Sequence, residues 1–193
     1  HAEATHSGFI YRPVMDVPFI VVNPRLVPRP GVVDTGVVST ADVTPTVLDL
    51  LGVQDGRARD GVSLVQERPD RRRTVYMETL VPYLDFGWAP LFGLRRLNDT
   101  YILAPRPEFY DLRSDPREAR DVYATATGVL REARDQQAGT LSRLLARWPP
   151  YSQAAVAAPP TDPEARARLE SLGYLAGAGT GGPSSGKLAD PKD

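Results

Sequence analysis

Three stretches near the start of the chain decide the fold: His1-Ala-Glu-Ala-Thr-His6-Ser-Gly-Phe-Ile-Tyr11, Phe19-Ile-Val-Val22 and Thr40-Ala-Asp-Val-Thr-Pro-Thr-Val-Leu-Asp-Leu-Leu-Gly52. The short apolar run 19–22 is typical of a strand buried on both faces of a parallel sheet. In the third stretch Ser39 or Thr40 can cap a helix, and Gly52 suits the position just after its end. The helix would present one apolar face, made of Val43, Val47, Leu50 and Leu51.

The composition restricts the classes of partner. A formal net charge of −1 over 193 residues gives no electrostatic reason to expect nucleic acid or an anionic membrane. The absence of cysteine excludes disulfides, thiolate metal sites and a cysteine nucleophile within these residues. No run approaches the roughly 18 apolar residues of a membrane-spanning helix. The compartment stays open, and a periplasmic or membrane-associated bacterial parent is compatible with the sequence.

The order of these stretches resembles bacterial sulfatases of the alkaline phosphatase superfamily. In that family a Glu-His-Gly-Glu-Ala-Thr-His-Gly segment leads into a tyrosine, a Val-Pro strand and an Asp-x-x-Pro-Thr helix. Here the corresponding residues are 1–6, Tyr11, Val17-Pro18 and Asp42 to Thr46. Three later signatures match as well: Asp60-Gly-Val-Ser-Leu64, Glu108-Phe-Tyr-Asp-Leu112 and Asp115-Pro-Arg-Glu118.

The resemblance implies an α/β, alkaline-phosphatase-like (sulfatase) fold of which this chain is a C-terminal fragment. Residues 1–123 would be the C-terminal part of the catalytic domain, including a small antiparallel sheet at about 74–112. Its expected strands are 74–78, 91–96, 101–103 and 108–112. Residues 124–150 are predicted to contain the C-terminal helix, over 128–148. Residues 151–193 are predicted to be a linker and low-complexity tail with a short helix at 163–172, without packed structure from about 176 onward.

The resemblance also implies where the chemistry lies. Cleavage of a sulfate ester needs a nucleophile and a divalent cation, and in sulfatases these are a formylglycine and, usually, calcium held by several Asp side chains. Both are expected upstream of His1, so no metal ligand is assigned within the chain. His6 matches the family residue that contacts the sulfate or protonates the leaving oxygen. The alternative is a histidine that caps or packs a loop. His1 matches a second motif histidine, for which structural hydrogen bonding is favoured over catalysis.

Other charged residues have competing interpretations. The family has a glutamate where Arg12 stands and an arginine where Asp16 stands, so a reciprocal swap predicts that the two form an ion pair. The alternative is two unrelated solvated charges, and the reversal puts the activity of the parent in doubt. Asp42 could be a metal ligand, but its place in the first turn of the predicted helix favours capping. Glu78, at a predicted strand end, is a further candidate for a residue that faces the substrate; the alternative is a residue of the core.

Three classes of function remain open. The leading hypothesis is a sulfatase acting on a sulfate ester; phosphodiesterases and phosphonate monoester hydrolases of the same superfamily are the alternative enzymes. A non-catalytic scaffold is the third possibility. The stretch from Arg168 to Tyr174, followed by a low-complexity spacer, resembles the junction at which some bacterial sulfatases continue into tetratricopeptide repeats. That likeness implies protein partners bound by downstream repeats. The sequence upstream would discriminate, because only the enzymes need the nucleophile and the Asp-rich metal motif.

Overall fold

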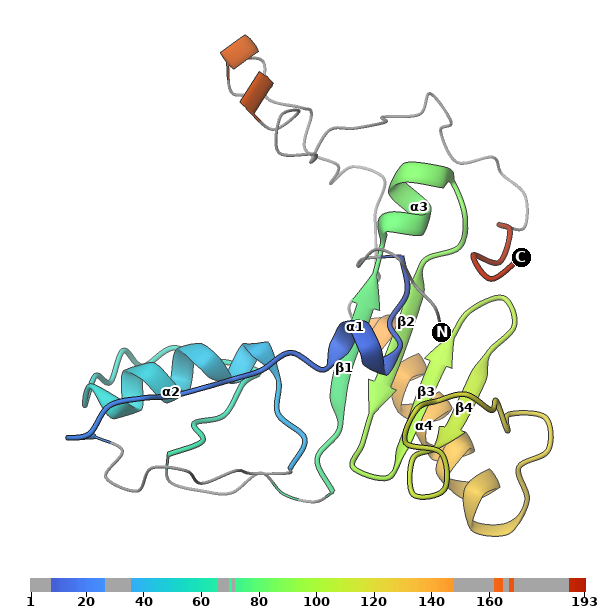
Figure 1. Ribbon diagram of the computed structural model, residues 1–193, viewed down its shortest axis with the longest axis horizontal. Helices are drawn as coiled ribbons and strands as arrows, with labels where there is room; N and C mark the ends of the chain where they lie inside the picture. The colour runs from blue at the N-terminus through green and yellow to red at the C-terminus, as the bar shows by residue number, and fades with distance from the viewer. Residues whose placement is uncertain are drawn as a thin grey trace.

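The computed structural model describes residues 8–26, 36–65, 70, 72–147, 162–164, 167–168 and 188–193. Figure 1 shows a twisted sheet with a long helix across one face, and a separate N-terminal region that carries a shorter helix. The elements in chain order are α1 (Arg12–Met15), the 3₁₀ helix η1 (Thr40–Asp42), α2 (Val43–Leu50), β1 (Val75–Thr79), α3 (Val81–Phe86), β2 (Leu91–Arg95), β3 (Asp99–Leu103), β4 (Glu108–Asp111) and α4 (Gly128–Arg147).

The sheet is an antiparallel meander in the order β1-β2-β3-β4. The register pairs Met77 with Gly93 between β1 and β2, and Tyr101 with Phe109 between β3 and β4. All four strands predicted for the small sheet are present, as is the C-terminal helix. The Asn98-Asp99 turn between the middle strands is also found, with Asp99 as the first residue of β3. The small antiparallel sheet and the C-terminal helix of the predicted fold class are therefore confirmed.

Each face of the sheet has its own apolar cluster. Helix α4 covers one face, where Leu141 packs with Phe92, Leu94, Tyr101 and Phe109. The segment after residue 8 covers the other face, where Ile10 and Tyr11 pack with Met77, Leu91, Ile102 and Tyr110. Gly93 permits this close approach, because a Cβ there would lie 2.9 Å from the Cδ1 atom of Ile10. The N-terminal segment is thus part of the core of the sheet.

Helix α4 turns a stripe of apolar and polar side chains, among them Arg134, Gln137 and Leu141, toward the sheet and its loops. Leu141 and Gln137 are fully buried, and the Gln137 side-chain amide donates a hydrogen bond to Asp99. Arg134 places its guanidinium 4.9 Å from the centre of the Tyr123 ring. The polar members of the stripe therefore have their own partners on the sheet and its loops. None of the helices in the described part of the chain is long and apolar enough to cross a membrane.

Helix α2 forms where the sequence predicts it. The 3₁₀ helix η1 leads into it: Ser39 accepts a hydrogen bond from the amide of Ala41, and the Asp42 carboxylate accepts one from the amide of Ser39, which completes a capping box. At the other end Gly52 has a φ of +66°, and the amide of Val53 bonds to the carbonyl of Leu48 at 2.9 Å. This pair of features is a Schellman termination, which the glycine makes possible.

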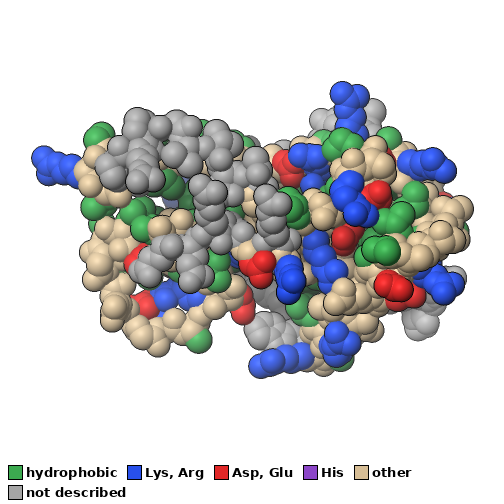
Figure 2. All heavy atoms as spheres, turned by 90° about the horizontal axis from the view of Figure 1, so that it is seen from below, with side chains coloured by type: hydrophobic (Ala, Val, Ile, Leu, Met, Phe, Trp, Pro, Cys, Tyr) green, Lys and Arg blue, Asp and Glu red, His purple; other side chains and the backbone are tan. Residues whose placement is uncertain are grey.

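The strand predicted at 19–22 is wrong for this structure. Residues 16–23 form no strand, and Ile20 and Val22 are 77% and 84% exposed. A strand of this kind needs neighbours for its backbone groups, and the described residues supply none beside it. The apolar face of α2 is likewise open, with Leu51 64% exposed. Figure 2 shows hydrophobic side chains at the surface of this half of the molecule, at the left.

The C-terminal tail departs from prediction at its end. Residues 188–193 pack beside the loop between β3 and β4 (Figure 1), and Asp190 is 6% exposed. The expectation of no packed structure is therefore wrong for these six residues, while 176–187 lie outside the described residues. The linker predicted at 151–160 also lies outside them. Within the predicted helix 163–172, the described residues 163–164 and 167–168 are helical.

Candidate functional site

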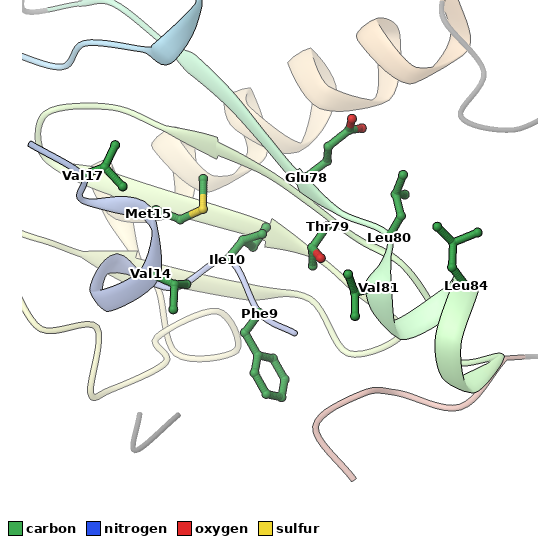
Figure 3. A pocket seen from close by; sticks show the side chains of 10 residues that line it. All are labelled: Phe9, Ile10, Val14, Met15, Val17, Glu78, Thr79, Leu80, Val81 and Leu84. Atoms are coloured by element: carbon green, nitrogen blue, oxygen red, sulfur yellow. The ribbon is translucent and has the colours of Figure 1, made fainter. Parts of the chain in front are cut away.

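A hollow in the described part of the surface lies along the edge of β1. It has a volume of about 690 Å³ and lies between the N-terminal segment and helix α3 (Figure 3). Its lining is mostly apolar: Phe9, Ile10, Val14, Met15, Val17, Leu80, Val81 and Leu84, with Glu78 and Thr79 from β1. The Glu78 carboxylate points away from Phe9 and Val14 in Figure 3 and accepts a hydrogen bond from the Tyr76 hydroxyl at 2.6 Å. The groove therefore offers apolar contact rather than a cluster of catalytic groups.

The segment that leads away from the histidine motif is fixed to the sheet by Tyr11. Its hydroxyl donates to the Glu108 carboxylate, 3.0 Å from Oε2, and its ring meets Tyr110 edge to face with centroids 6.2 Å apart. Burial, and then the nearby Glu108 charge, raise the pKa of Tyr11 far above its ordinary value. The hydroxyl therefore stays protonated and acts as a hydrogen-bond donor at any physiological pH.

A buried carboxylate holds the next residue. Glu118 is fully buried, and its Oε2 accepts from the backbone amide of Arg12 at 2.7 Å. Its Oε1 accepts from Arg95 and from the Thr100 hydroxyl, each at 2.7 Å. Burial lowers the pKa of Arg95, and the Glu118 charge opposes that shift. Glu118 therefore ties the start of α1 to the middle of the sheet.

The predicted pair of Arg12 and Asp16 is confirmed. The Nε atom of Arg12 lies 2.5 Å from Oδ2 of Asp16, and Arg12 also donates to the carbonyl of Pro116 at 2.7 Å. The side chains are 40% and 51% exposed. At that exposure the pair should contribute only about 0–1 kcal/mol, because water competes for both charges.

Asp42 serves the structural role predicted for it. It is fully buried, and its oxygens accept from the amides of Ser39 and Val62 and from both terminal nitrogens of Arg73. Burial would raise the pKa of Asp42, but the Arg73 and backbone hydrogen bonds bring it below the ordinary value of 3.8. Four donors occupy its lone pairs, so the arrangement does not fit a cation ligand.

The loop that completes the Asp42 cluster explains the Asp60-Gly-Val-Ser-Leu64 signature. A Cβ at Gly61 would lie 2.0 Å from the carbonyl oxygen of Ala41, so only glycine fits. The Ser63 hydroxyl donates to Asp49 at 2.6 Å, and the Leu64 amide donates to Thr46 at 3.1 Å. This signature therefore docks a loop along α2, and its role is structural.

The two histidines predicted as site residues, His1 and His6, lie outside the described residues, and their roles stay predictions. Among the residues that the structure does describe, no group of three or more His, Asp or Glu side chains could hold a metal ion. The described side chains thus do not form a site for the expected calcium. What the structure does place is the segment that follows the two histidines, which Tyr11 and Arg12 hold against the sheet.

The sequence does not predict the role of two residues that hold this arrangement together, Glu118 and Lys192. From the sequence, Glu118 belongs only to the Asp115-Pro-Arg-Glu118 signature. Its fixed place three residues after Asp115 is the one signal in the sequence that marks it. Lys192 was assigned to an unpacked tail, yet its ammonium lies 3.2 Å from Oε1 of Glu108, with both side chains 13% exposed. Only the fold brings this lysine to Glu108.

Comparison with known proteins links part of the chain to a sulfatase. No family model matches. Over 124 residues, 61% of the chain, the sequence is 32% identical to choline-sulfatase of Rhizobium meliloti (strain 1021). The chain spans about a quarter (23%) of the length of that curated relative. This similarity agrees with the fold class predicted from the sequence.

Two solved structures show partial likeness. The phosphonate monoester hydrolase of Agrobacterium radiobacter is 26% identical, with a TM-score of 0.43, over 57% of this chain and 25% of its own. A 2-O GAG sulfatase is 18% identical, with a TM-score of 0.43, over 65% of this chain and 28% of its own. The similarity to a sulfatase therefore rests on the sequence match to choline-sulfatase, which covers part of the chain.

Proposed function

We propose that this chain is the C-terminal part of a sulfatase-type hydrolase that cleaves sulfate esters. The observation that supports it most is the 32% identity to choline-sulfatase over 124 residues. In this proposal the nucleophile and the cation ligands, with calcium as the expected cation, lie upstream of His1. His6 contacts the sulfate group or protonates the leaving oxygen, and His1 orders the same segment by hydrogen bonding.

The geometry supports the proposal through the anchors that follow His6. Ile10 fills the core, while Tyr11 and Arg12 are held by Glu108 and Glu118. A catalytic side chain must be held close to its reacting position, and the first of these two hydrogen-bonded anchors, Tyr11, lies five positions after His6. The open apolar surface of 17–22 and α2 supports a larger fold, since such surface is usually covered.

The first test uses the full-length protein and two matched variants. His6→Ala should lower turnover of an aryl sulfate by roughly 10²-fold or more, because it removes a general acid from the site. His1→Ala, which changes the other histidine of the same motif, should cost less. Equal and small effects of both changes would contradict the role of His6. Parallel assays with a phosphodiester and a phosphonate monoester decide between the enzyme classes, since higher activity on either would displace the sulfatase proposal.

The second test uses the 193-residue chain alone. It should show no turnover of an aryl sulfate with added calcium, and no micromolar calcium affinity by calorimetry, because a calcium site needs several converging oxygen ligands. Turnover above background would overturn the placement of the active site. The continuation into tetratricopeptide repeats, with its protein partners, stays a prediction that the downstream sequence would test.

A further inference from the structure

The last six residues make specific contacts with the sheet, and their own sequence favours the turn that makes these contacts. The amide of Asp193 bonds to the carbonyl of Asp190 at 3.1 Å, which closes a tight turn with Pro191 at its second position. Asp190 stabilises the turn from within, because its Oδ1 accepts from the amide of Lys192 at 3.0 Å. Aspartate followed by proline is the favoured start of such a turn. The segment is therefore shaped locally, before it meets the sheet.

Two backbone amides of the sheet region bind this turn, one through a carbonyl of the turn and the other through the Asp190 carboxylate. The amide of Ala89, just before β2, donates to the carbonyl of Ala189 at 2.8 Å. The amide of Arg106, in the loop between β3 and β4, donates to Oδ2 of Asp190 at 2.9 Å. Asp190 is 6% exposed, and its side chain is one that proteins bury only when it is paired. These two amides select a carbonyl and a carboxylate at a fixed spacing.

Lysine 192 completes the recognition from the other side of the turn. Its ammonium donates to the Arg106 carbonyl at 2.5 Å and lies 3.2 Å from Oε1 of Glu108. The other oxygen of Glu108 accepts the Tyr11 hydroxyl. The contact between Arg106 and Asp193 is exposed on both sides and contributes little. A chain of contacts thus runs from the C-terminal segment through Glu108 to the N-terminal segment.

We propose that Ala89, Arg106 and Glu108 form a binding site for a short peptide of the pattern Ala-Asp-Pro-Lys-Asp, occupied in this molecule by residues 189–193 of its own chain. The occupied site acts as a clasp: Lys192 fixes the Glu108 carboxylate, which in turn fixes the Tyr11 hydroxyl. The inference concerns a contact within this chain and does not depend on sulfatase activity.

The test compares Asp190→Asn with Asp162→Asn in the full-length protein. Asp162→Asn removes the same charge from the same tail. Asp162 is exposed, and among the described contacts it accepts a hydrogen bond only from the amide of Glu164. Amide hydrogen exchange is read at Ala89 and Arg106, with the amides of β2 and β3 as the internal reference. Asp190→Asn should speed exchange at the two site amides about 10-fold or more, because it removes a charge-assisted hydrogen bond. Asp162→Asn should leave them unchanged.

A peptide added in trans makes the test decisive. The peptide Leu-Ala-Asp-Pro-Lys-Asp, at about millimolar concentration so that it competes with the tethered tail of the variant, should restore protection of Ala89 and Arg106 in the Asp190→Asn protein. The same peptide with Asn at its first aspartate should not. If Asp190→Asn disturbs the whole sheet, Lys192→Ala serves instead: it keeps the turn and Asp190, removes the contacts of Lys192 with the Arg106 carbonyl and with Glu108, and should speed exchange at the two site amides by a smaller factor. Wild-type exchange at both site amides in both variants, or no effect of either peptide, would overturn the proposal.

Discussion

The sheet region (residues 72–147) and the α2 region (residues 17–26 and 36–65) contain the same kinds of apolar residue, but the first buries them and the second leaves several exposed. In residues 72–147 the side chains of Phe109 and Leu141 are fully buried, and helix α4 and the N-terminal segment each cover one face of the sheet. In residues 17–65, Ile20, Val22 and Leu51 lie mostly in solvent. The sheet region completes its own core, while the α2 region relies on capping, on Asp42 and on its docked loop. Apolar pattern alone therefore does not say whether a segment can bury itself.

The largest effect should come from the core of the sheet. Phe109→Ala should lower the free energy of unfolding of the sheet region by up to about 5 kcal/mol, because it leaves a cavity under α4. Urea unfolding monitored by tyrosine fluorescence measures the change. The matched change Val22→Ala, at an 84% exposed site, should stay within about 0.5 kcal/mol in this chain.

The effect of Val22→Ala in the full-length protein tests whether the exposed segment 17–22 is covered there. If other segments cover residues 17–22 there, Val22→Ala should cost about 1–2 kcal/mol, the transfer free energy of the two lost carbon groups. A cost as small as in the isolated chain would show that the segment stays exposed, and would count against the larger fold proposed above.

Glu118→Ala should have the next largest effect, about 3–4 kcal/mol, because it leaves the buried guanidinium of Arg95 without its partner. Glu118→Gln keeps the shape and hydrogen-bonding capacity and should cost less. Thermal unfolding gives both values. Equal costs for the two variants would mean that the charge of Glu118 is irrelevant, and that only its packing matters.

In the α2 region the effect of Asp42→Asn should be about 3 kcal/mol and should depend on pH. The folded pKa of Asp42 lies below its unfolded value, so its contribution is full above about pH 4 and is lost as the pH falls through the folded pKa. Hydrogen exchange of the α2 amides at pH 7 and near pH 3 measures it. The difference between wild type and variant should shrink at the lower pH; a constant difference would contradict the assignment.

The smallest effect should be that of Asp16→Asn, about 0–1 kcal/mol, because the Arg12 pair is exposed. A double-mutant cycle with Arg12→Gln isolates the pair from the Pro116 contact of Arg12. A coupling energy well above 1 kcal/mol would show that the swapped pair is protected from solvent by residues beyond the described ones.

Local patterns were sufficient for most of the regular elements of this protein, but not for the short helices α1 and α3. Helix α2, with its serine cap and Gly52 termination, and the four strands of the sheet follow from capping chemistry, turn residues and short β-rich runs. The capping role of Asp42 and the pair formed by Arg12 and Asp16 were also predictable, because partners at a spacing of three or four residues meet on one turn of helix. The strand predicted at 19–22 was wrong, because a strand needs neighbouring strands to pair with and its own residues do not specify them.

The sequence by itself determined the capped helix, the strand segments of the sheet and the turn at Asp190, because each depends on residues only a few positions apart. Tertiary structure alone decided that Glu118 holds Arg12, that Arg73 reaches Asp42, and that Lys192 pairs with Glu108. These partners are separated by up to 106 residues, and no local preference selects them. Burial decides them: a carboxylate taken out of water keeps its charge only where the fold brings donors to it.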